Sequence, residues 1–233
     1  MDNHRLEEAA TRLADLVSRL RGPGGCPWDA RQTEDTIRMY LLEETYEVLD
    51  AVERRVWPEI CGELGDLLFQ ILFLARLAEE KKAFDLVDVM EGITLKMIRR
   101  HPHVFGSVRA DTPEEVAENW ARIKREENCG VKARAGGLCA VPDGMPALLR
   151  AHRLNQRAAA AEDVAGDPRG DLNDVQKDLE QLKAALDEAD KDKLAERFGA
   201  LLFDLAGLAG RYGLNAEDAL RRANRHFANR KAS

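Results

Sequence analysis

The sequence predicts an all-α protein built from two helical bundle domains in tandem. Nearly every segment of the 233 residues carries apolar residues three and four positions apart, and almost none alternates as a strand would. Hydrophobic residues make up 45% of the chain, which is enough for buried cores. A helical pattern from the first half also recurs in the second half.

The helical period defines the expected elements in order. Helices are predicted at about 5–20, 34–55, 58–80, 86–100, 113–127, 145–160, 172–188, 191–211 and 216–230. Three helix starts carry local signals. Pro58 suits a first helical turn, Asp85 can cap the helix that follows it, and Thr112 to Glu115 reads as a capping box.

Two segments without helical period indicate breaks in the chain. The stretch from Cys129 to Gly144 is rich in glycine and reads as a linker or mobile loop, and a second break at 161–171 precedes another set of helices. We therefore expect an N-terminal domain at 1–127, a linker at 128–144 and a C-terminal domain at 145–233.

Four acidic residues in two predicted helices are the strongest functional signal. Glu44 and Glu47 in LLEETYEVLD, and Glu63 and Asp66 in GELGDLLFQ, are each spaced i, i+3. This spacing places each pair on one helix face, about one turn apart. Carboxylates gathered from two such helices would repel unless a cation joined them, and oxygen ligands suit Mg²⁺, with Mn²⁺ also possible.

An acidic helix face is more often simply solvated in a chain that is 33% charged. The first helix argues against that interpretation, because Ile37, Leu41, Val48 and Val52 form an apolar stripe whose gap is filled by Glu44. Glu44 is therefore predicted to point inward, where an unpaired carboxylate is costly.

In the second helix the two acids lie at the margin of a broad apolar stripe. This stripe is predicted to be buried and consists of Leu64, Leu67, Leu68, Ile71, Leu74 and Ala75. An inward acid on the first helix and marginal acids on the second favour a bound cation over two solvated faces.

The second half of the chain repeats the first at a constant shift, which brings Glu63 to Arg197. ELGDLLFQILFLARL, from Glu63, and RFGALLFDLAGLAGRY, from Arg197, share a glycine, Leu-Leu-Phe and several apolar positions. Unrelated amphipathic helices also look alike, but here one shift serves both helices. The four acidic positions are then occupied by Asp178, Gln181, Arg197 and Ala200. We predict that the second domain has kept the fold and lost the metal.

A cluster of bases ends the predicted helix at 86–100. Lys96, Arg99 and Arg100 are followed by His101 and His103 in LKMIRRHPHVFG. Fixed cations beside a metal site would share the charge of a polyphosphate, although bases also complement any helix C-terminus. Lys96 and Arg100 share a face, and the two histidines are expected to cap or pack rather than to bind metal.

The segment GPGGCPWD, from Gly22 to Asp29, is too specific in composition for a random linker. Its Trp28 either packs on the bundle, which we favour, or stacks on a nucleotide base.

Charge and composition exclude several classes of protein. A net charge of −7 argues against broad nucleic-acid binding. No apolar run reaches the length of a membrane span, and the acidic N-terminus is unlike a signal peptide, so we expect a cytoplasmic protein. Cysteines without C-x-x-C spacing are expected to be free thiols rather than zinc ligands; they are Cys26, Cys61, Cys129 and Cys139.

The acidic motifs resemble those of a known family. EETYE at 43–47 followed by ELGD at 63–66 resembles the E-E-x-x-E and E-x-x-D signature of the MazG-type nucleoside triphosphate pyrophosphohydrolases. GCPWD and RRHPHVFG resemble the N-terminal domain of its tandem members, and MPALLRAHRLNQRAA resembles their interdomain segment. The resemblance covers essentially the whole chain and is most specific in residues 1–106.

This resemblance implies tandem helical domains, a homodimer, and Mg²⁺-dependent hydrolysis of nucleoside triphosphates to monophosphate and pyrophosphate. The four paired acids would hold the ion, and Glu43 or Glu47 would orient and deprotonate the attacking water. Lys96, Arg99 and Arg100 would neutralise phosphate charge, in one arrangement across a dimer interface, and Trp28 is a further candidate for substrate binding.

The second domain departs from the family signature. Lys177 replaces Glu43. In the last helix, at a shift four residues shorter, His226 stands where Lys96 would align, although Arg230 matches Arg100. If the protein is active, the N-terminal domain must carry the chemistry.

Two other classes of protein compete with this interpretation. A ferritin-like di-iron bundle needs Glu-x-x-His pairs, and none of the five histidines has an acid three residues before it. A non-catalytic helical module that binds a nucleotide or a protein partner is the stronger alternative.

Overall fold

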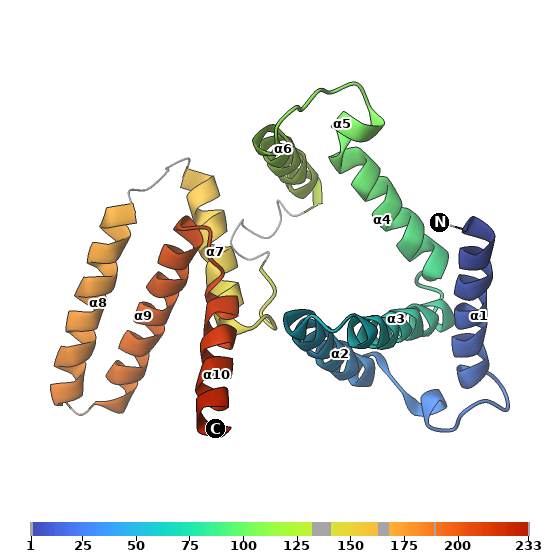
Figure 1. The fold of residues 1–233 in the computed structure, drawn as a ribbon, viewed down its shortest axis with the longest axis horizontal. Coiled ribbons are helices and arrows are strands. Elements are labelled where there is room, and N and C mark those ends of the chain that lie inside the picture. Colours follow the sequence, from blue (N-terminus) through green and yellow to red (C-terminus); the bar gives the residue numbers. More distant parts are fainter. Residues whose placement is uncertain (1, 132–140, 163–167, 189, 233) are drawn as a thin grey trace. The chain divides into compact units, whose positions relative to one another are not determined.

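The computed structural model describes residues 2–131, 141–162, 168–188 and 190–232. Within these ranges the regular structure is entirely helical, which confirms the all-α prediction (Figure 1). The chain divides into two compact units, Met1–Trp120 and Ala121–Ser233. None of the described helices is long and apolar enough to cross a membrane.

The first unit begins with a long helix and a tight loop, and its helices are followed by those of the second unit. The elements in chain order are α1 (Asn3–Arg21), η1 (Asp29–Arg31), α2 (Glu34–Arg54), α3 (Trp57–Glu80), α4 (Leu86–Arg100), α5 (Pro102–Phe105), α6 (Pro113–Val131), α7 (Ala147–Glu162), α8 (Pro168–Glu188), α9 (Lys191–Arg211) and α10 (Ala216–Ala232). The border between the units falls inside α6, whereas the sequence placed the end of the first domain at 127.

The sequence missed η1 and α5 because each is too short to show a helical period. α6 runs to Val131, so Cys129 and Gly130 are helical and not part of a loop. α8 begins at Pro168, inside the predicted break, since proline is well suited to a first helical position. Residues 132–140 of the predicted linker lie outside the described residues.

The predicted helix starts are confirmed. Asp85 caps α4 by accepting from the Asp88 N–H, and Pro58 lies in the first turn of α3. Thr112 accepts from the Glu115 N–H at 3.2 Å. Only half of the predicted capping box forms, because the Glu115 carboxylate accepts from the Asp111 N–H instead.

The core of the first unit lies where α1 crosses α2 and the C-terminal half of α3. Val17, Ile37, Leu72, Phe73 and Leu77 form this cluster. The predicted burial of the whole α3 stripe is wrong at three positions. Exposed fractions there are 50% for Leu64, 45% for Leu68 and 39% for Ile71, and Val52 of α2 is also exposed.

The loop after α1 is built around one arginine. Arg21 donates two hydrogen bonds to the Glu80 carboxylate, at 2.9 and 2.7 Å, and others to the carbonyl oxygens of Asp29 and Gln32 at 2.6 and 3.3 Å. Its guanidinium lies 5.2 Å from the centre of the Phe73 ring. This pairing lowers the pKa of Glu80 and fixes the loop that carries Trp28 to the end of α3.

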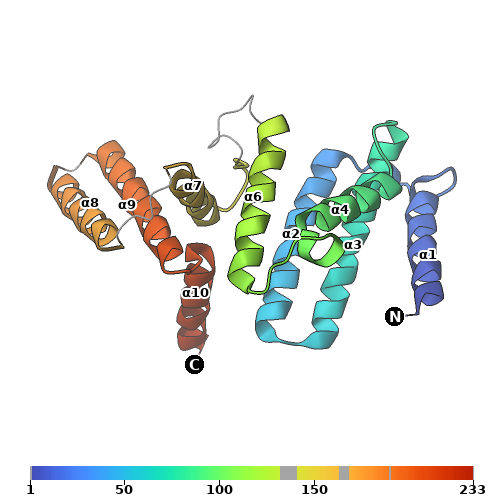
Figure 2. The same ribbon diagram turned by 90° about the horizontal axis from the view of Figure 1, so that it is seen from above.

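In the second unit α9 packs against both α7 and α8 (Figure 2). The close approach of α7 to α9 depends on glycine, because a Cβ at Gly207 would lie 2.8 Å from Asn155 Oδ1. The first residues of α2 and α8, Glu34 and Pro168, are separated by the same number of residues as those of α3 and α9, Trp57 and Lys191. This is also the shift that brings Glu63 to Arg197 in the sequence repeat.

We predict that Arg21→Met lowers the free energy of unfolding by about 2–3 kcal/mol, because Glu80 then keeps only Arg76 as a partner and two loop carbonyl oxygens lose the guanidinium as a donor. Arg19→Met, on the same helix at an exposed position, is the control. The stability that the Arg21–Glu80 pair contributes should be complete above the ordinary carboxyl pKa of 4.5. It should be lost as the pH falls through the lowered pKa of Glu80. Equal chemical denaturation curves for the two variants at pH 7 would contradict the assignment.

Candidate metal centre

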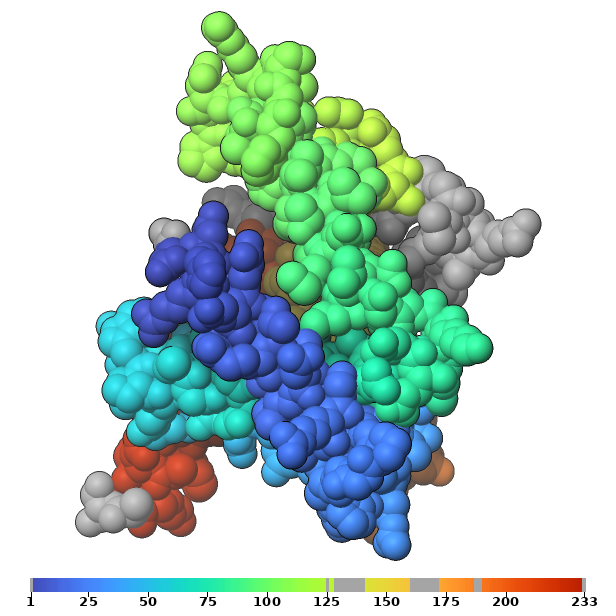
Figure 3. Space-filling model, turned by 90° about the vertical axis from the view of Figure 1, so that its right-hand side faces the viewer, coloured from blue at the N-terminus to red at the C-terminus, as the bar shows by residue number. Residues whose placement is uncertain are grey.

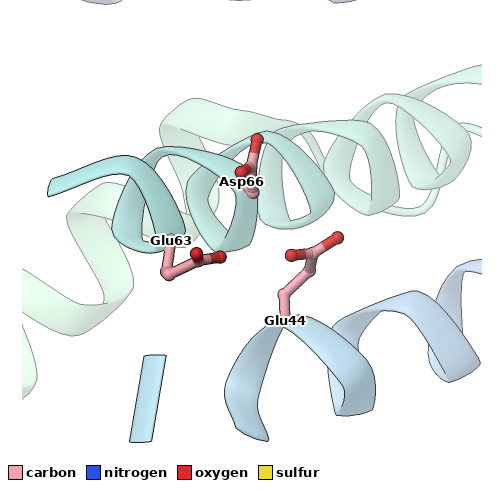
Figure 4. A group of neighbouring side chains, drawn as sticks. All are labelled: Glu44, Glu63 and Asp66. Atoms are coloured by element: carbon pink, nitrogen blue, oxygen red, sulfur yellow. The ribbon is translucent and has the colours of Figure 1, made fainter. Parts of the chain in front are cut away.

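Three of the predicted ligands converge between α2 and α3. Glu44 on α2 and Glu63 on α3 point toward each other, with Asp66 one turn further along α3 (Figure 4). One carboxylate oxygen from each residue lies within 4.8 Å of the other two. Glu44 and Glu63 are half-buried and Asp66 is exposed.

The hairpin between the helices sets this convergence. α2 is capped at its C-terminus by Arg55, whose φ of 59° is left-handed, and α3 begins two residues after this cap. Glu47 and Glu63 are each eight residues from Arg55, and Glu44 and Asp66 are each eleven. Because both helices rise equally per residue, equal separation from the turn brings each acid to the level of its counterpart.

Glu47 completes the predicted set of four. Its side chain is exposed on α2, and it lies close enough to Glu63 to act on the pKa of that carboxyl group. Burial raises the pKa of Glu63, and the negative charge and hydrogen bond of Glu47 raise it further. Two carboxyl groups this close favour either a shared proton or a cation.

Glu44, like Glu63, needs a proton or a cation to offset the charge of its neighbours. Burial raises the pKa of Glu44, and so do the charges of Glu47, Asp66 and Glu43, while a hydrogen bond from Gln70 opposes the shift. A half-buried cluster of carboxyl oxygens that resists ionisation fits a hard divalent ion with oxygen ligands. Glu43, the other candidate for the general base, is exposed on α2.

The predicted cations lie in the last turns of α4. Lys96 is half-buried, and the Arg100 guanidinium lies 5.3 Å from the centre of the Trp120 ring. Arg99 is exposed and, like Arg100, makes interactions of its own. The aromatic partner Trp120 was not singled out from the sequence.

The histidines after α4 behave as the sequence predicted. His101 is both the C-cap of α4 and the N-cap of α5, and its Nδ1 lies 2.7 Å from the Met97 carbonyl oxygen. Its ring packs at 5.7 Å from that of His103. Neither belongs to the carboxylate cluster.

Trp28 contradicts the favoured interpretation of its loop. The residue is 66% exposed, so its ring is not packed on the bundle. The rest of the loop is well ordered by contacts, since a Cβ at Gly25 would lie 2.3 Å from the carbonyl oxygens of Arg19 and Leu20. The structure thus presents an indole to solvent on a tightly folded turn.

Sequence reasoning also missed Gln70, whose side chain acts to lower the pKa of Glu44. A signal was present, since Gln70 follows Asp66 by four residues and therefore shares its helix face. An amide on a helix is usually solvated, which is why the position drew no attention.

The second unit replaces the acidic cluster by a hydrogen bond. Arg197 Nη1 donates to Gln181 Oε1 at 2.6 Å, joining α9 to α8 in a partly buried position. At the shift of the repeat, these residues stand at the positions of Glu63 and Glu47. No second carboxylate cluster is present among the described residues of this unit.

Comparison with known proteins identifies several relatives. Residues 32–105, within the first unit, match the MazG nucleotide pyrophosphohydrolase domain. A nucleoside triphosphate pyrophosphohydrolase of Escherichia coli (strain K12) is 43% identical over 225 residues, which cover 94% of this chain and 84% of that protein. A nucleoside triphosphate pyrophosphohydrolase/pyrophosphatase MazG of Thermotoga maritima is 36% identical over 228 residues, which cover 97% and 86%.

A solved structure, of a mazG-related protein from Thermotoga maritima, is 28% identical, covers 49% of this chain and 98% of its own, and has a TM-score of 0.43. The two relatives named above match along most of their own length. The matched domain contains both acidic motifs, from Glu44 to Asp66. On this evidence the chain belongs to the MazG family of nucleotide pyrophosphohydrolases.

Proposed function

We propose that the protein hydrolyses nucleoside triphosphates to the monophosphate and pyrophosphate, and that Mg²⁺ is its metal, with Mn²⁺ as a substitute. The supporting observation is the convergence of Glu44, Glu63 and Asp66 within 4.8 Å, inside the domain matched by the family. The relatives from Escherichia coli and Thermotoga maritima carry names for this activity.

Glu44, Glu47, Glu63 and Asp66 would hold the divalent ion, and the raised pKa values of Glu44 and Glu63 support this role. When bound, such an ion polarises the attacked phosphorus and neutralises charge on the phosphate oxygens. Glu43 or Glu47 orients the attacking water and takes its proton. The water oxygen bonds to the α-phosphorus as the bond from that phosphorus to the bridging oxygen breaks, releasing pyrophosphate.

Lys96, Arg99 and Arg100 neutralise the remaining phosphate charge. Trp28 is proposed to stack on the base, which is supported by its 66% exposure on an ordered turn. The Arg100 guanidinium is stacked on the Trp120 ring. This contact gives it a defined position from which to meet an anionic substrate.

We also propose that the protein acts as a homodimer. Exposed apolar side chains on two helices support this, because a folded protein rarely leaves so many large ones uncovered. They are Leu64, Leu68 and Ile71 on α3 and Val87, Met90 and Ile93 on α4. Figure 3 shows α4, in green, lying at the surface of the first unit.

The two units are proposed to divide the work. The domains at 1–127 and 145–233 would be tandem copies joined at 128–144, with chemistry in the first alone. The Gln181–Arg197 hydrogen bond supports a non-catalytic role for the second unit, because a fixed guanidinium stands where a metal ligand would be needed. The cytoplasm is the proposed location, consistent with the free thiols Cys26 and Cys61.

Incubation of the protein with ATP and Mg²⁺ in ¹⁸O-labelled water should yield AMP and pyrophosphate, with the label on AMP. Water attacking the α-phosphorus leaves its oxygen there, so mass spectrometry of the products locates the attack. Unlabelled AMP with labelled pyrophosphate would place the attack on the β-phosphorus. ADP and orthophosphate as sole products would exclude the reaction class.

Glu44→Ala and Asp66→Ala should each lower turnover by about 100-fold or more, because each loses a metal ligand. Removal of a carboxylate from a repelling cluster should leave the metal-free thermal midpoint unchanged or slightly higher. Glu79→Ala, which removes an exposed acid from the same helix as Asp66, controls for the loss of surface charge. Full turnover by either ligand variant would remove the proposed site.

The division of work is tested by two equivalent substitutions in the full chain. Asp178→Ala should leave turnover within about twofold of wild type, whereas Glu44→Ala, at the matching position of the first unit, should abolish it. A fragment ending near 127 should retain the chemistry if it still dimerises, and one starting near 145 should be inert. Activity confined to the C-terminal fragment would reverse the assignment.

A further inference from the structure

A polar pocket lies among three helices of the second unit, where α9 is placed between α7 and α8 (Figure 1). The space between the lining atoms is about 380 Å³, which is in the range of small-molecule binding sites. The lining residues are Asn155 of α7, Asp174 of α8, and Asp204, Gly207, Leu208 and Arg211 of α9. None of them has a part in the chemistry proposed for the first unit.

The same positions of the first unit form its hydrophobic core. At the separation of the repeat, Gly207 corresponds to Phe73, Arg211 to Leu77 and Asp174 to Tyr40. Phe73 and Leu77 are 1% and 4% exposed, and Tyr40 packs against the cluster that contains them. The second unit therefore has an open polar pocket at the place where the first unit is filled by apolar side chains.

The separation of the repeat also holds for the first helix of each pair of facing helices. It relates Ala151 of α7 to Val17 of α1, and both residues are buried. It also relates Asn155 to Arg21, whose guanidinium lies over the Phe73 ring in the first unit. An arginine and a phenylalanine that meet in the first unit are thus replaced by an asparagine and a glycine. These exchanges to smaller residues open the pocket.

Asn155 is held in one orientation at the pocket. Its Nδ2 donates to the carbonyl oxygens of Ala151, at 3.0 Å, and of Phe203, at 3.4 Å. Its Oδ1 faces Gly207, because a Cβ added to that glycine would lie 2.8 Å from this oxygen. The pocket therefore has a fixed hydrogen-bond acceptor beside its glycine.

The charged groups are separated along the pocket. Asp204 and Arg211 are seven residues apart, so they share a face of α9 about two turns apart, with Gly207 between them. Asp174 stands fourteen residues before the end of α8, and Asp204 thirteen residues after the start of α9. Because both helices rise equally per residue, the two carboxylates lie at nearly the same level. One end of the pocket is thus acidic and the other carries a guanidinium.

We propose that this pocket binds a small zwitterion that carries a protonated amine at one end and a carboxylate at the other. The amine lies between Asp174 and Asp204, because a positive charge there offsets the repulsion of the two carboxylates. The carboxylate of the ligand pairs with Arg211, whose planar guanidinium suits two parallel hydrogen bonds. This site is separate from the proposed chemistry and does not depend on it.

The charge pattern argues against two other classes of ligand. A triphosphate would bring several negative charges to a pocket with two carboxylates and one guanidinium. A diamine would place its second positive charge at the guanidinium. Only a molecule with both signs of charge meets an opposite charge at each end.

The test measures binding to the full-length protein by isothermal titration calorimetry. The probes are the unbranched amino acids from glycine to 6-aminohexanoate, which differ in the separation of amine and carboxylate. Butyrate and putrescine are the controls, because they match 4-aminobutyrate in chain length but carry only the acid or only amines. At least one amino acid of the series should bind with a millimolar or lower dissociation constant, and both controls should bind about 10-fold or more weakly.

Substitutions locate the bound molecule. Asp174→Asn and Arg211→Met should each weaken binding of the best probe by about 10-fold or more, because each removes one charged contact. Glu180→Gln, which neutralises an exposed acid of α8 outside the pocket, should leave the affinity unchanged. Arg211→Glu makes both ends acidic and should bind putrescine more tightly than any amino acid of the series.

Restoring the residues of the first unit separates a binding site from a core that has merely lost its packing. The double variant Asp174→Tyr, Arg211→Leu should abolish binding and raise the thermal midpoint, because it fills the pocket with apolar groups. Absence of binding for the whole series, equal binding of the two controls, or unchanged affinity in Asp174→Asn or the double variant would overturn the proposal.

Discussion

Repulsion between carboxyl groups across the α2–α3 interface is the constraint on which the first unit depends. Glu44 and Glu63 both have raised pKa values because they are drawn out of water toward other acids. Such a helix pair needs stabilisation from elsewhere. The core around Phe73 and the Arg21–Glu80 pair provide it at the opposite end of α3. Stability and chemistry therefore occupy different turns of one helix.

The second unit shows that the helix pair does not require the acids. α8 and α9 start at the same shift from α2 and α3, and both pairs share Leu-Leu-Phe. Where Glu47 and Glu63 repel, Gln181 and Arg197 attract at 2.6 Å. The acidic pair of the first unit lowers the stability of its helix pair, whereas the hydrogen-bonded pair at the same positions of the second unit raises it. What the helix pairs share at this end is their apolar sequence, and what differs is the single face on which a metal would depend.

The sequence predicted that the acids meet, because the physics there is local. Helical spacing and equal separation from Arg55 decide which acids come together, and neither depends on distant parts of the chain. Burial was predicted less well. Periodicity identifies Leu64, Leu68 and Ile71 as an apolar face, but it cannot say whether this chain or another covers it. Trp28 was misjudged for a related reason, since the role of an indole is set by its neighbours in space.

The exposed apolar face and the acidic face lie on the same helix, and this links the two proposals of dimerisation and metal binding. Leu64 directly follows Glu63, so a partner packed over Leu64 and Leu68 would also restrict water near the carboxylates. Less water lowers the local dielectric, which strengthens repulsion among the acids and their attraction for a cation. Dimerisation would then tighten metal binding, and the ion would stabilise the dimer by the same free energy, because coupling between two binding events is reciprocal.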